Sequence, residues 1–174
     1  MNLEMKSIKY FEANSEETYD YRAVVYLDGK PFADVSNDGH GGSDRVHHHA
    51  KSPLIKIEGA WNKKFQEIEE YFASLPKQDV GKYDWCPEGF DQKFEYWCHE
   101  QVENFLHKRN MKKEFNKYVI AKLKEDGEFR FAFFKKTKGQ PDWLLKEAIK
   151  NKYEDVTIVN DLPEAEALEV WRTT

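Results

Sequence analysis

The fold is decided by residues 19–36, which read YDYRAVVYLDGKPFADVS. Apolar side chains alternate over the first nine positions, which is typical of a strand with one buried face. Asp28-Gly29 is a common two-residue hairpin turn, so the residues after it return as the partner strand. Residues 3–11 add a third strand. The start of the chain therefore predicts an antiparallel β-meander.

A helix is predicted after the meander, because apolar residues recur at steps of three and four until Pro76 ends the pattern. A stripe of this kind is typical of a helix that packs on a sheet and leaves its other face in water. The stripe comprises Trp61, Phe65, Ile68, Phe72 and Leu75.

A second helix is predicted over residues 94–108. Its apolar face includes Cys98, and its acidic residues, Glu95 among them, are expected to face water. His99 and His107 lie about two turns apart on this helix. We expect them at the surface or in a capping role.

The last third of the chain has a mixed pattern. Residues 118–123 and 128–135 predict a second hairpin, with three phenylalanines on one side of its second strand. A helix is expected from Pro141, followed by a short buried strand over residues 156–159. Residues 161–164, DLPE, have a capping-box pattern that predicts the start of a final helix.

These patterns predict the α+β fold class: an N-terminal antiparallel β-meander with a packed helix, followed by a β-hairpin/α/β/α lobe. The predicted domains are residues 1–76 and residues 93–174, joined by a linker over residues 77–92. One compact domain is the alternative, because 174 residues are close to the usual size of a single domain.

Composition argues against several classes of protein. Aromatic residues make up 15% of the chain, which is too many for a disordered tail. The net charge of −5 disfavours nucleic acid as a partner. The sequence has no apolar stretch of about 18 residues and no leader-like start, so we expect no membrane contact and no secretion.

Cysteine content favours a cytoplasmic protein. The two cysteines, Cys86 and Cys98, are too few for a disulfide framework and do not form a paired zinc motif. We expect both to be free thiols, with Cys98 in the core and Cys86 in a loop.

The glycine-rich loop over residues 37–44 is the stretch most suggestive of chemistry. Its glycines permit positive φ, so backbone amides can converge on an anion, and we expect a site for a ligand or a partner. The candidate site residues are Asn37, Asp38, Gly39, His40, Gly41, Gly42, Ser43 and Asp44.

Two other interpretations of this loop stay open. Asp and His side chains are ordinary ligands of divalent metals, so Asp38, His40 and Asp44 form an alternative metal site. The loop can also be a plain turn in which Asn37 and Asp38 bond their own backbone. The leading interpretation includes no catalytic residue, no metal and no cofactor.

Residues 47–49 are three consecutive histidines. Neighbouring side chains of an extended segment point to opposite faces, so three adjacent imidazoles cannot share one ion well. We therefore expect an exposed polar loop here.

Two strings resemble a known kind of protein. Residues 35–42, VSNDGHGG, and residues 158–163, IVNDLP with an acidic helix after it, are similar to a family of uncharacterised small proteins from bacteriophages and bacterial accessory genomes. The resemblance spans most of the chain. It implies a phage-type context, in which counter-defence and host-takeover functions are common, and it implies no activity, cofactor or catalytic residue.

We therefore expect a non-enzymatic binding protein that inhibits a host defence component, in the host cytoplasm if it is phage-encoded. A host protein is the expected partner, and a small anionic ligand is the alternative partner. The alternative function is a metal-dependent phosphoesterase or a nucleotide-binding protein that uses the glycine-rich loop. The third is a single-strand nucleic-acid binder that uses the lysine-rich second hairpin. The sequence sets no oligomeric state.

Overall fold

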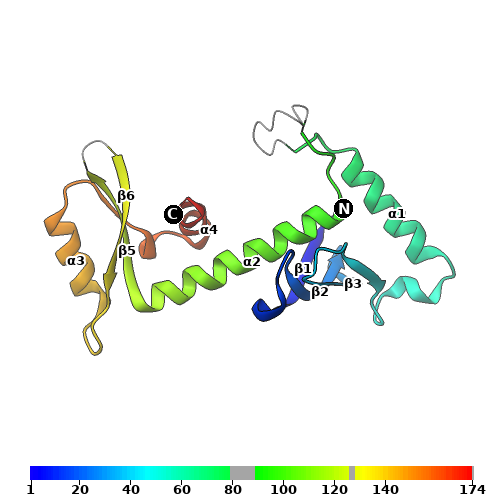
Figure 1. Cartoon of the computed structure of the whole chain (residues 1–174), viewed down its shortest axis with the longest axis horizontal. Helices are drawn as coiled ribbons and strands as arrows, with labels where there is room; N and C mark the ends of the chain where they lie inside the picture. The colour runs from blue at the N-terminus through cyan, green and yellow to red at the C-terminus, as the bar shows by residue number, and fades with distance from the viewer. Residues whose placement is uncertain (79–88, 126–127, 174) are drawn as a thin grey trace. The chain divides into compact units, whose positions relative to one another are not determined.

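The computed structural model describes residues 1–78, 89–125 and 128–173. It confirms the α+β fold class, with an antiparallel four-stranded sheet near the N-terminus, four α-helices and a three-stranded sheet within these ranges. The chain divides into two compact units, Met1–Glu103 and Asn104–Thr174 (Figure 1). They are called the N-terminal and the C-terminal unit below.

The predicted linker over residues 77–92 falls largely on residues 79–88, which lie outside the described residues. The division between the two compact units comes later in the chain, within a helix. The domain boundaries expected from the sequence stay predictions.

The N-terminal unit contains the predicted meander, extended by one strand. Strands β1 (Leu3–Tyr10), β2 (Asp20–Leu27), β3 (Lys30–Asp38) and β4 (Arg45–His48) pair antiparallel in the order β1-β2-β3-β4. The turn at Asp28-Gly29 has φ values of 47° and 78°, and a type I′ hairpin requires two such positive values. Alternate β2 side chains form the buried face: Tyr21, Ala23, Val25 and Leu27.

The loop expected over residues 47–49 is wrong, because its first two histidines belong to β4, although both are exposed as expected. Val46 pairs with Val35, and His47 pairs with Asp34. The backbone N–H and C=O groups of β3 that point away from β2 need hydrogen-bond partners. The glycine-rich loop reverses the chain, so that β4 supplies these partners. The sequence pattern missed this strand because it carries arginine and histidine instead of alternating apolar residues.

Helix α1 (Ala60–Ala73) confirms the predicted apolar stripe, with Ile68 and Phe72 buried. At the start of the helix, Trp61 donates its Nε1–H to the Phe32 carbonyl oxygen at 3.0 Å and stacks on the Phe32 ring. An apolar contact and a hydrogen bond therefore both join α1 to β3.

Helix α2 (Phe94–Lys117) is longer than the predicted helix, which ended at Lys108. The residues beyond that point read RNMKKEFNK; six of these nine are Arg, Met, Lys or Glu, which favour helix, and none is Gly or Pro. Within the N-terminal unit, α2 buries Phe94, Cys98 and Val102. Across the described ranges, none of the helices has both the length and the apolar character that crossing a bilayer requires.

The C-terminal unit holds the rest of α2, a three-stranded sheet and two further helices. Strands β5 (Tyr118–Glu125), β6 (Glu128–Lys135) and β7 (Val156–Ile158) pair antiparallel in the order β6-β5-β7. Helices α3 (Asp142–Lys152) and α4 (Glu164–Arg172) lie on opposite faces of this sheet (Figure 1). The elements predicted for this part of the chain are therefore confirmed.

A separate apolar cluster fills each face of the C-terminal sheet. The cluster on the α4 side contains Met111, Ile120, Val159, Ala167 and Leu168. The cluster on the α3 side contains Val119, Ala121, Leu123, Ile149 and Ile158. The C-terminal unit thus has a core of its own.

Asn160 continues the sheet past the end of β7. Its Oδ1 accepts the Ile120 N–H at 2.7 Å, and its Nδ2 donates to the Tyr118 carbonyl oxygen at 3.1 Å. A side-chain amide offers a donor and an acceptor as a backbone residue does, so it can take the place of a strand residue beside β5.

The capping box predicted over residues 161–164 is wrong, although a helix does begin there. Pro163 is the N-cap of α4, and no side chain caps this helix start in the described structure. The Asp161 carboxylate instead pairs with Lys146 at 2.5 Å and with Lys150 at 3.6 Å. Acidic residues in the first turn of α4 still favour the helix start electrostatically.

Candidate functional site

Asn37 organises the glycine-rich loop from within. It is 4% exposed, and its Oδ1 accepts hydrogen bonds from the Thr18 hydroxyl at 2.8 Å and the Gly39 N–H at 2.9 Å. Its Nδ2 donates to the Gly42 carbonyl oxygen at 2.8 Å and to Asp44 Oδ1 at 3.1 Å. The amide therefore holds both ends of the loop and offers little to a ligand.

Gly39 joins this loop to the segment before β2. Its carbonyl oxygen accepts the backbone N–H groups of Glu16, Glu17 and Thr18 at 3.0–3.2 Å. Its φ is +84°, and a Cβ at this position would lie 2.2 Å from the Asn14 carbonyl oxygen. Glycine is required here by backbone conformation and by close approach together.

The other predicted loop residues lie mainly at the surface. Asp38 forms an ion pair with Arg45, and His40 Nδ1 lies 3.4 Å from Glu16 Oε2. The Gly41 N–H donates to the Thr18 hydroxyl at 3.3 Å. Gly41, Gly42 and Ser43 are exposed, so ligand binding by this part of the loop stays a prediction.

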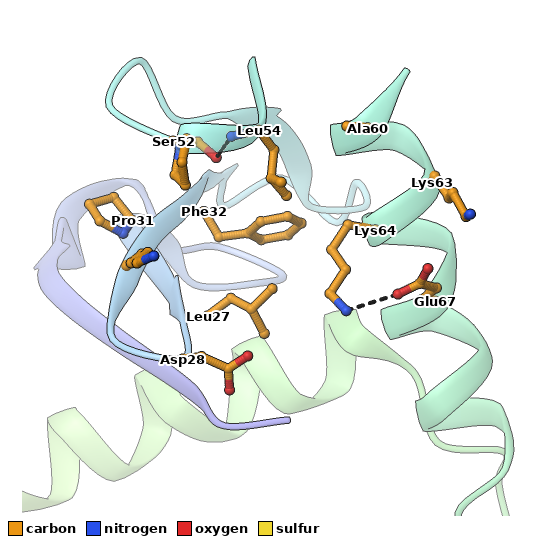
Figure 2. Close-up of a pocket in the computed structure, with 12 residues that line it drawn as sticks. Leu27, Asp28, Pro31, Phe32, Ser52, Leu54, Ala60, Lys63, Lys64 and Glu67 are labelled. Atoms are coloured by element: carbon orange, nitrogen blue, oxygen red, sulfur yellow. Dashed lines mark hydrogen bonds and ion pairs between the residues drawn. The ribbon is translucent and has the colours of Figure 1, made fainter. Parts of the chain in front are cut away.

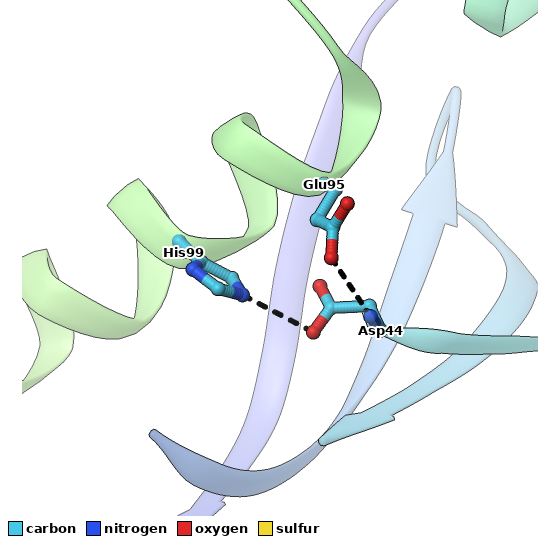
Figure 3. A group of neighbouring side chains, drawn as sticks. All are labelled: Asp44, Glu95 and His99. Carbon is cyan, nitrogen blue, oxygen red and sulfur yellow. Dashed lines mark hydrogen bonds and ion pairs between the residues drawn. The ribbon is translucent and has the colours of Figure 1, made fainter. Parts of the chain in front are cut away.

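Asp44 is the centre of a polar cluster (Figure 3). Its side chain is 2% exposed, and its Oδ2 accepts the Tyr21 hydroxyl at 2.5 Å. His99 Nε2 lies 3.2 Å from Asp44 Oδ1, and the Asp44 backbone N–H donates to Glu95 Oε1 at 2.9 Å. With the Asn37 amide, this cluster joins β2, the glycine-rich loop and α2 within the N-terminal unit.

Glu95 and His99 reach Asp44 together because residues four apart lie on the same helix face. Glu95 and His99, which were expected to face water and to lie at the surface or in a capping role, are half-buried, and both contact Asp44. The two residues lie 51 and 55 positions from Asp44 along the chain, so no local pattern links them to it. The available sequence signal was a Glu-x-x-x-His spacing beside a buried apolar stripe.

The cluster shifts the ionisation of three groups. The hydrogen bond to Asp44 raises the pKa of His99 above its ordinary value of 6.5, although burial opposes this. Burial is the main cause that raises the pKa of Tyr21, so this hydroxyl stays protonated and donates to Asp44. Burial also raises the pKa of Cys98, with the charges of Asp44 and Glu95 adding to it.

Cys98 is a free, fully buried thiol, which confirms the prediction for this cysteine. A raised pKa and complete burial keep it protonated, so it is a core residue and not a nucleophile. Cys86 lies outside the described residues.

The cluster offers ligand atoms for a divalent cation. Among the described residues, Asp44, Glu95 and His99 can each supply one ligand atom, and these atoms lie within 4.8 Å of one another. Two carboxylates and an imidazole suit first-row divalent metals. A cation would take the place of a proton on His99 Nε2, because a ligating nitrogen must be unprotonated. Tyr21 and Asn37 would then orient the Asp44 carboxylate from behind.

A pocket opens elsewhere in the N-terminal unit, beside the β2–β3 hairpin (Figure 2). Its volume is about 490 Å³, within the range of small-ligand sites. It is bounded by the hairpin, the 3₁₀ helix η2 (Pro53–Lys56) and α1. Leu27, Phe32 and Leu54 give it an apolar interior.

The rim of the pocket carries charges of both signs. Lys64 Nζ lies 2.8 Å from Glu67 Oε2 (Figure 2). Asp28 Oδ1 accepts the Asn2 N–H at 2.9 Å. Lys30 also lines the pocket, and the described residues include no ion-pair partner for it. The pocket therefore suits an apolar group that is accompanied by polar or charged ones.

Comparison with known proteins gave no match: no protein-family model, no curated protein and no solved structure is similar to this chain.

Proposed function

We propose that this protein is a non-enzymatic binding protein, and that the pocket of its N-terminal unit receives an apolar side chain of a partner protein. The observation that carries the proposal is the apolar interior formed by Leu27, Phe32 and Leu54 behind a rim of mixed charge. Fully burying a large apolar side chain contributes about 1.5–3 kcal/mol, more than an exposed ion pair supplies.

Exposed apolar residues next to the pocket in the chain favour a protein partner over a small molecule. Ile55 and Ile57 follow Leu54 directly in and after η2, and they are 40% and 62% exposed. Large apolar side chains in water beside a pocket are typical of interaction surfaces. A small ligand would fill the pocket and leave these two isoleucines in water.

The resemblance to phage and accessory-genome proteins that the VSNDGHGG string predicts, to which no family model or curated protein adds a match, bears on the identity of the partner. It supports a host protein, and within that class a component of host defence, as the partner that this protein inhibits. The exposed residues Gly41, Gly42 and Ser43 form a second predicted contact. A small anionic ligand at Lys30 is the alternative occupant of the pocket.

The test is capture from bacterial host lysate by the full chain, read by mass spectrometry of proteins and of extracted small molecules. The pocket variant is Leu54→Asn/Ile57→Asn. Its matched control is Trp143→Asn/Leu144→Asn, which removes two apolar side chains that are 60% and 45% exposed in the C-terminal unit.

We expect a host protein that the wild-type chain and the control retain and that the pocket variant loses. Fluorescence titration with the apolar anion anilinonaphthalene sulfonate checks the pocket directly and should weaken about tenfold in the same variant. Equal capture by all three proteins, or capture of a small anion alone, contradicts the proposal. Gly41→Ala/Gly42→Ala in the same assay tests the loop contact.

A second candidate function is binding of a divalent cation by Asp44, Glu95 and His99. It is favoured by the approach of their ligand atoms to within 4.8 Å around a buried, oriented carboxylate. This set replaces Asp38 and His40 as the partners of Asp44 in the metal interpretation. A bound divalent cation is also the first requirement of a metal-dependent phosphoesterase, which is the alternative function expected from the sequence.

Calorimetric titration with Mn²⁺ alone tests this site. We expect one equivalent to bind the wild-type chain and binding to weaken at least about tenfold in Glu95→Gln, which keeps an acceptor for the Asp44 N–H. Asp38→Asn is the control and should bind like the wild type. Loss in Asp38→Asn with no change in Glu95→Gln would favour the loop residues, and no heat with the wild-type chain would exclude the site.

A further inference from the structure

Strand β6 is an edge of the C-terminal sheet. The order of strands is β6-β5-β7, and among the described residues β6 pairs with β5 alone. Two of its aromatic side chains are in water, Phe129 at 60% exposure and Phe133 at 44%. An edge strand of eight residues with exposed aromatics is a template for pairing with another strand.

The hydrogen bonds of β5 show which groups of β6 face outward. The Lys136 N–H donates to the Lys117 carbonyl oxygen at 2.9 Å, so this pair is of the hydrogen-bonded kind. Hydrogen-bonded pairs recur at every second residue, so the backbone N–H and C=O groups of the even-numbered β6 residues point toward β5. The N–H and C=O groups of Phe129, Phe131 and Phe133 therefore point away from the sheet.

The same three phenylalanines share one face, the α4 side of the sheet. Phe131 packs on the buried cluster there, and the Phe133 ring lies 6.4 Å from the Trp171 ring. Phe129 lies under Lys122, whose Nζ is 4.5 Å from the ring centroid. The outward backbone groups and the exposed aromatic side chains thus belong to the same residues.

We propose that β6 pairs antiparallel with β6 of a second copy of this chain, with Phe131 opposite Phe131. In this register Phe129 of one copy lies opposite Phe133 of the other, and each outward N–H and C=O of these residues finds a partner. The two three-stranded sheets then form one continuous sheet. Such an isologous contact is the commonest way in which identical chains associate.

Other registers are less favourable. A shift by one residue places the phenylalanine face of one copy on the opposite side from that of the other. A shift that centres the pairing on Arg130 sets two guanidinium groups against each other. A shift that centres it on Ala132 places Phe129 opposite Lys135 instead of an aromatic ring. Of these registers, the one about Phe131 sets Phe129 opposite Phe133 without like charges opposite each other.

Sedimentation velocity of the full chain over a range of concentrations tests the proposal. We expect a monomer–dimer equilibrium in the wild-type chain. Phe129→Glu/Phe133→Glu sets like charges opposite each other across the contact and should give a monomer, as should Phe129→Lys/Phe133→Lys. A mixture of these two variants should restore the dimer, because opposite charges then meet.

The control is Trp143→Glu/Leu144→Glu, which changes exposed apolar residues of α3 and should leave the dimer intact. Circular dichroism checks that each variant is folded. A wild-type chain that stays monomeric up to its highest soluble concentration overturns the proposal. So does a dimer that persists in Phe129→Glu/Phe133→Glu.

A disulfide experiment tests the register and does not depend on the charge variants. In a Cys86→Ser background, which leaves only the buried Cys98, Phe129→Cys/Phe133→Cys should form a covalent dimer on mild oxidation, because position 129 of one copy faces position 133 of the other. Neither single substitution should do so, since each then faces phenylalanine. Cross-linking by the single variants to the same extent as by the double variant would overturn this register.

Discussion

Gly39 has a structural task that is more demanding than its place in a glycine-rich loop suggests. Its carbonyl oxygen gathers three backbone N–H groups, and its α-carbon has no room for a side chain. Gly42, three positions later, has no atom within 4 Å of the place where a Cβ would lie. Two glycines of one string therefore differ in their tolerance of substitution.

Gly39→Ala is expected to lower the free energy of unfolding by about 1–3 kcal/mol, because the added Cβ meets a backbone oxygen at positive φ. Urea unfolding followed by circular dichroism measures the change. Gly42→Ala is the matched control and should stay within about 0.5 kcal/mol of the wild type. Equal losses in the two variants would mean that the contact with Asn14 does not constrain this loop.

His99 gives a second prediction at the residue scale. Its pKa is raised in the folded protein by Asp44, so its contribution to stability is fully present below the ordinary value of 6.5 and is lost as the pH rises through the raised value. NMR titration of the imidazole in metal-free buffer should show a pKa above 6.5. Asp44→Asn should lower it. An unchanged pKa in that variant would contradict the Asp44–His99 hydrogen bond.

The sequence indicated the loop but not the cluster that forms behind it. Asn37 and Asp44 lie in the predicted site, yet Asn37 and the buried Asp44 side chain serve mainly to fix the loop. Their helical partners could not be predicted from spacing, because the contact depends on where α2 packs on the sheet. Tertiary placement, rather than residue type, decides which polar groups meet.

At the scale of elements, local patterns predicted what local physics controls. Both hairpins contain Asp-Gly between two apolar strands, and both form as expected. Strand β4 was missed because its formation depends on the free edge of β3 and not on its own composition. The longer α2 was missed because the predicted boundary followed the apolar stripe, whereas the helix continues through residues of high helix propensity.

Helix α1 gives a prediction at this scale. Phe72 is 4% exposed, and its ring contacts Phe94 at 6.1 Å, whereas the neighbouring Tyr71 is 42% exposed. Phe72→Ala should lower the free energy of unfolding by about 3–5 kcal/mol through lost burial and a cavity. Phe65 is half-buried, and its ring contacts those of Trp61 and Phe94. Phe65→Ala should therefore lower the free energy of unfolding by less than Phe72→Ala does.

Urea unfolding of the single variants measures these changes. Tyr71→Ala serves as the control, and a change of under about 1 kcal/mol is expected because its side chain is partly in water. If Tyr71→Ala destabilised the protein as much as Phe72→Ala, the buried face of α1 would be assigned wrongly.

Among the described residues, each compact unit has buried apolar residues of its own, and this predicts the order in which parts of the protein unfold. Ile68 belongs to the buried core of the N-terminal unit, and Ile158 to a cluster of the C-terminal unit. Units with separate cores can open separately. Ile68→Ala should therefore lower amide protection mainly in the N-terminal unit, and Ile158→Ala mainly in the C-terminal unit.

Hydrogen exchange followed by mass spectrometry measures this protection along the chain. Each variant is the control for the other, because both delete the same side chain from a fully buried site. Equal loss of protection in both units for both substitutions would show a single cooperative structure.

The two units also separate the proposed functions. The pocket and the Asp44 cluster belong to the N-terminal unit, and the β6 edge belongs to the C-terminal unit. Phe129→Glu/Phe133→Glu should therefore leave the titration with anilinonaphthalene sulfonate unchanged while it abolishes self-association. If this variant lost dye binding as well as self-association, the pocket would depend on the dimer.

The C-terminal sheet depends on the side-chain amide of Asn160, which makes the sheet sensitive to deamidation at this residue. Hydrolysis of this amide to a carboxylate would replace the Nδ2 donor with an oxygen, which would then face the Tyr118 carbonyl oxygen that it now binds. The new carboxylate oxygen and the Tyr118 carbonyl oxygen are both acceptors, so the hydrogen bond at the start of β5 would be lost. In the native protein the Ile120 N–H holds Oδ1 and restrains the side chain from the approach to its own backbone through which deamidation begins. Stored samples should therefore deamidate at this position mainly after the sheet has opened, and each molecule so altered should refold less readily than a fresh one.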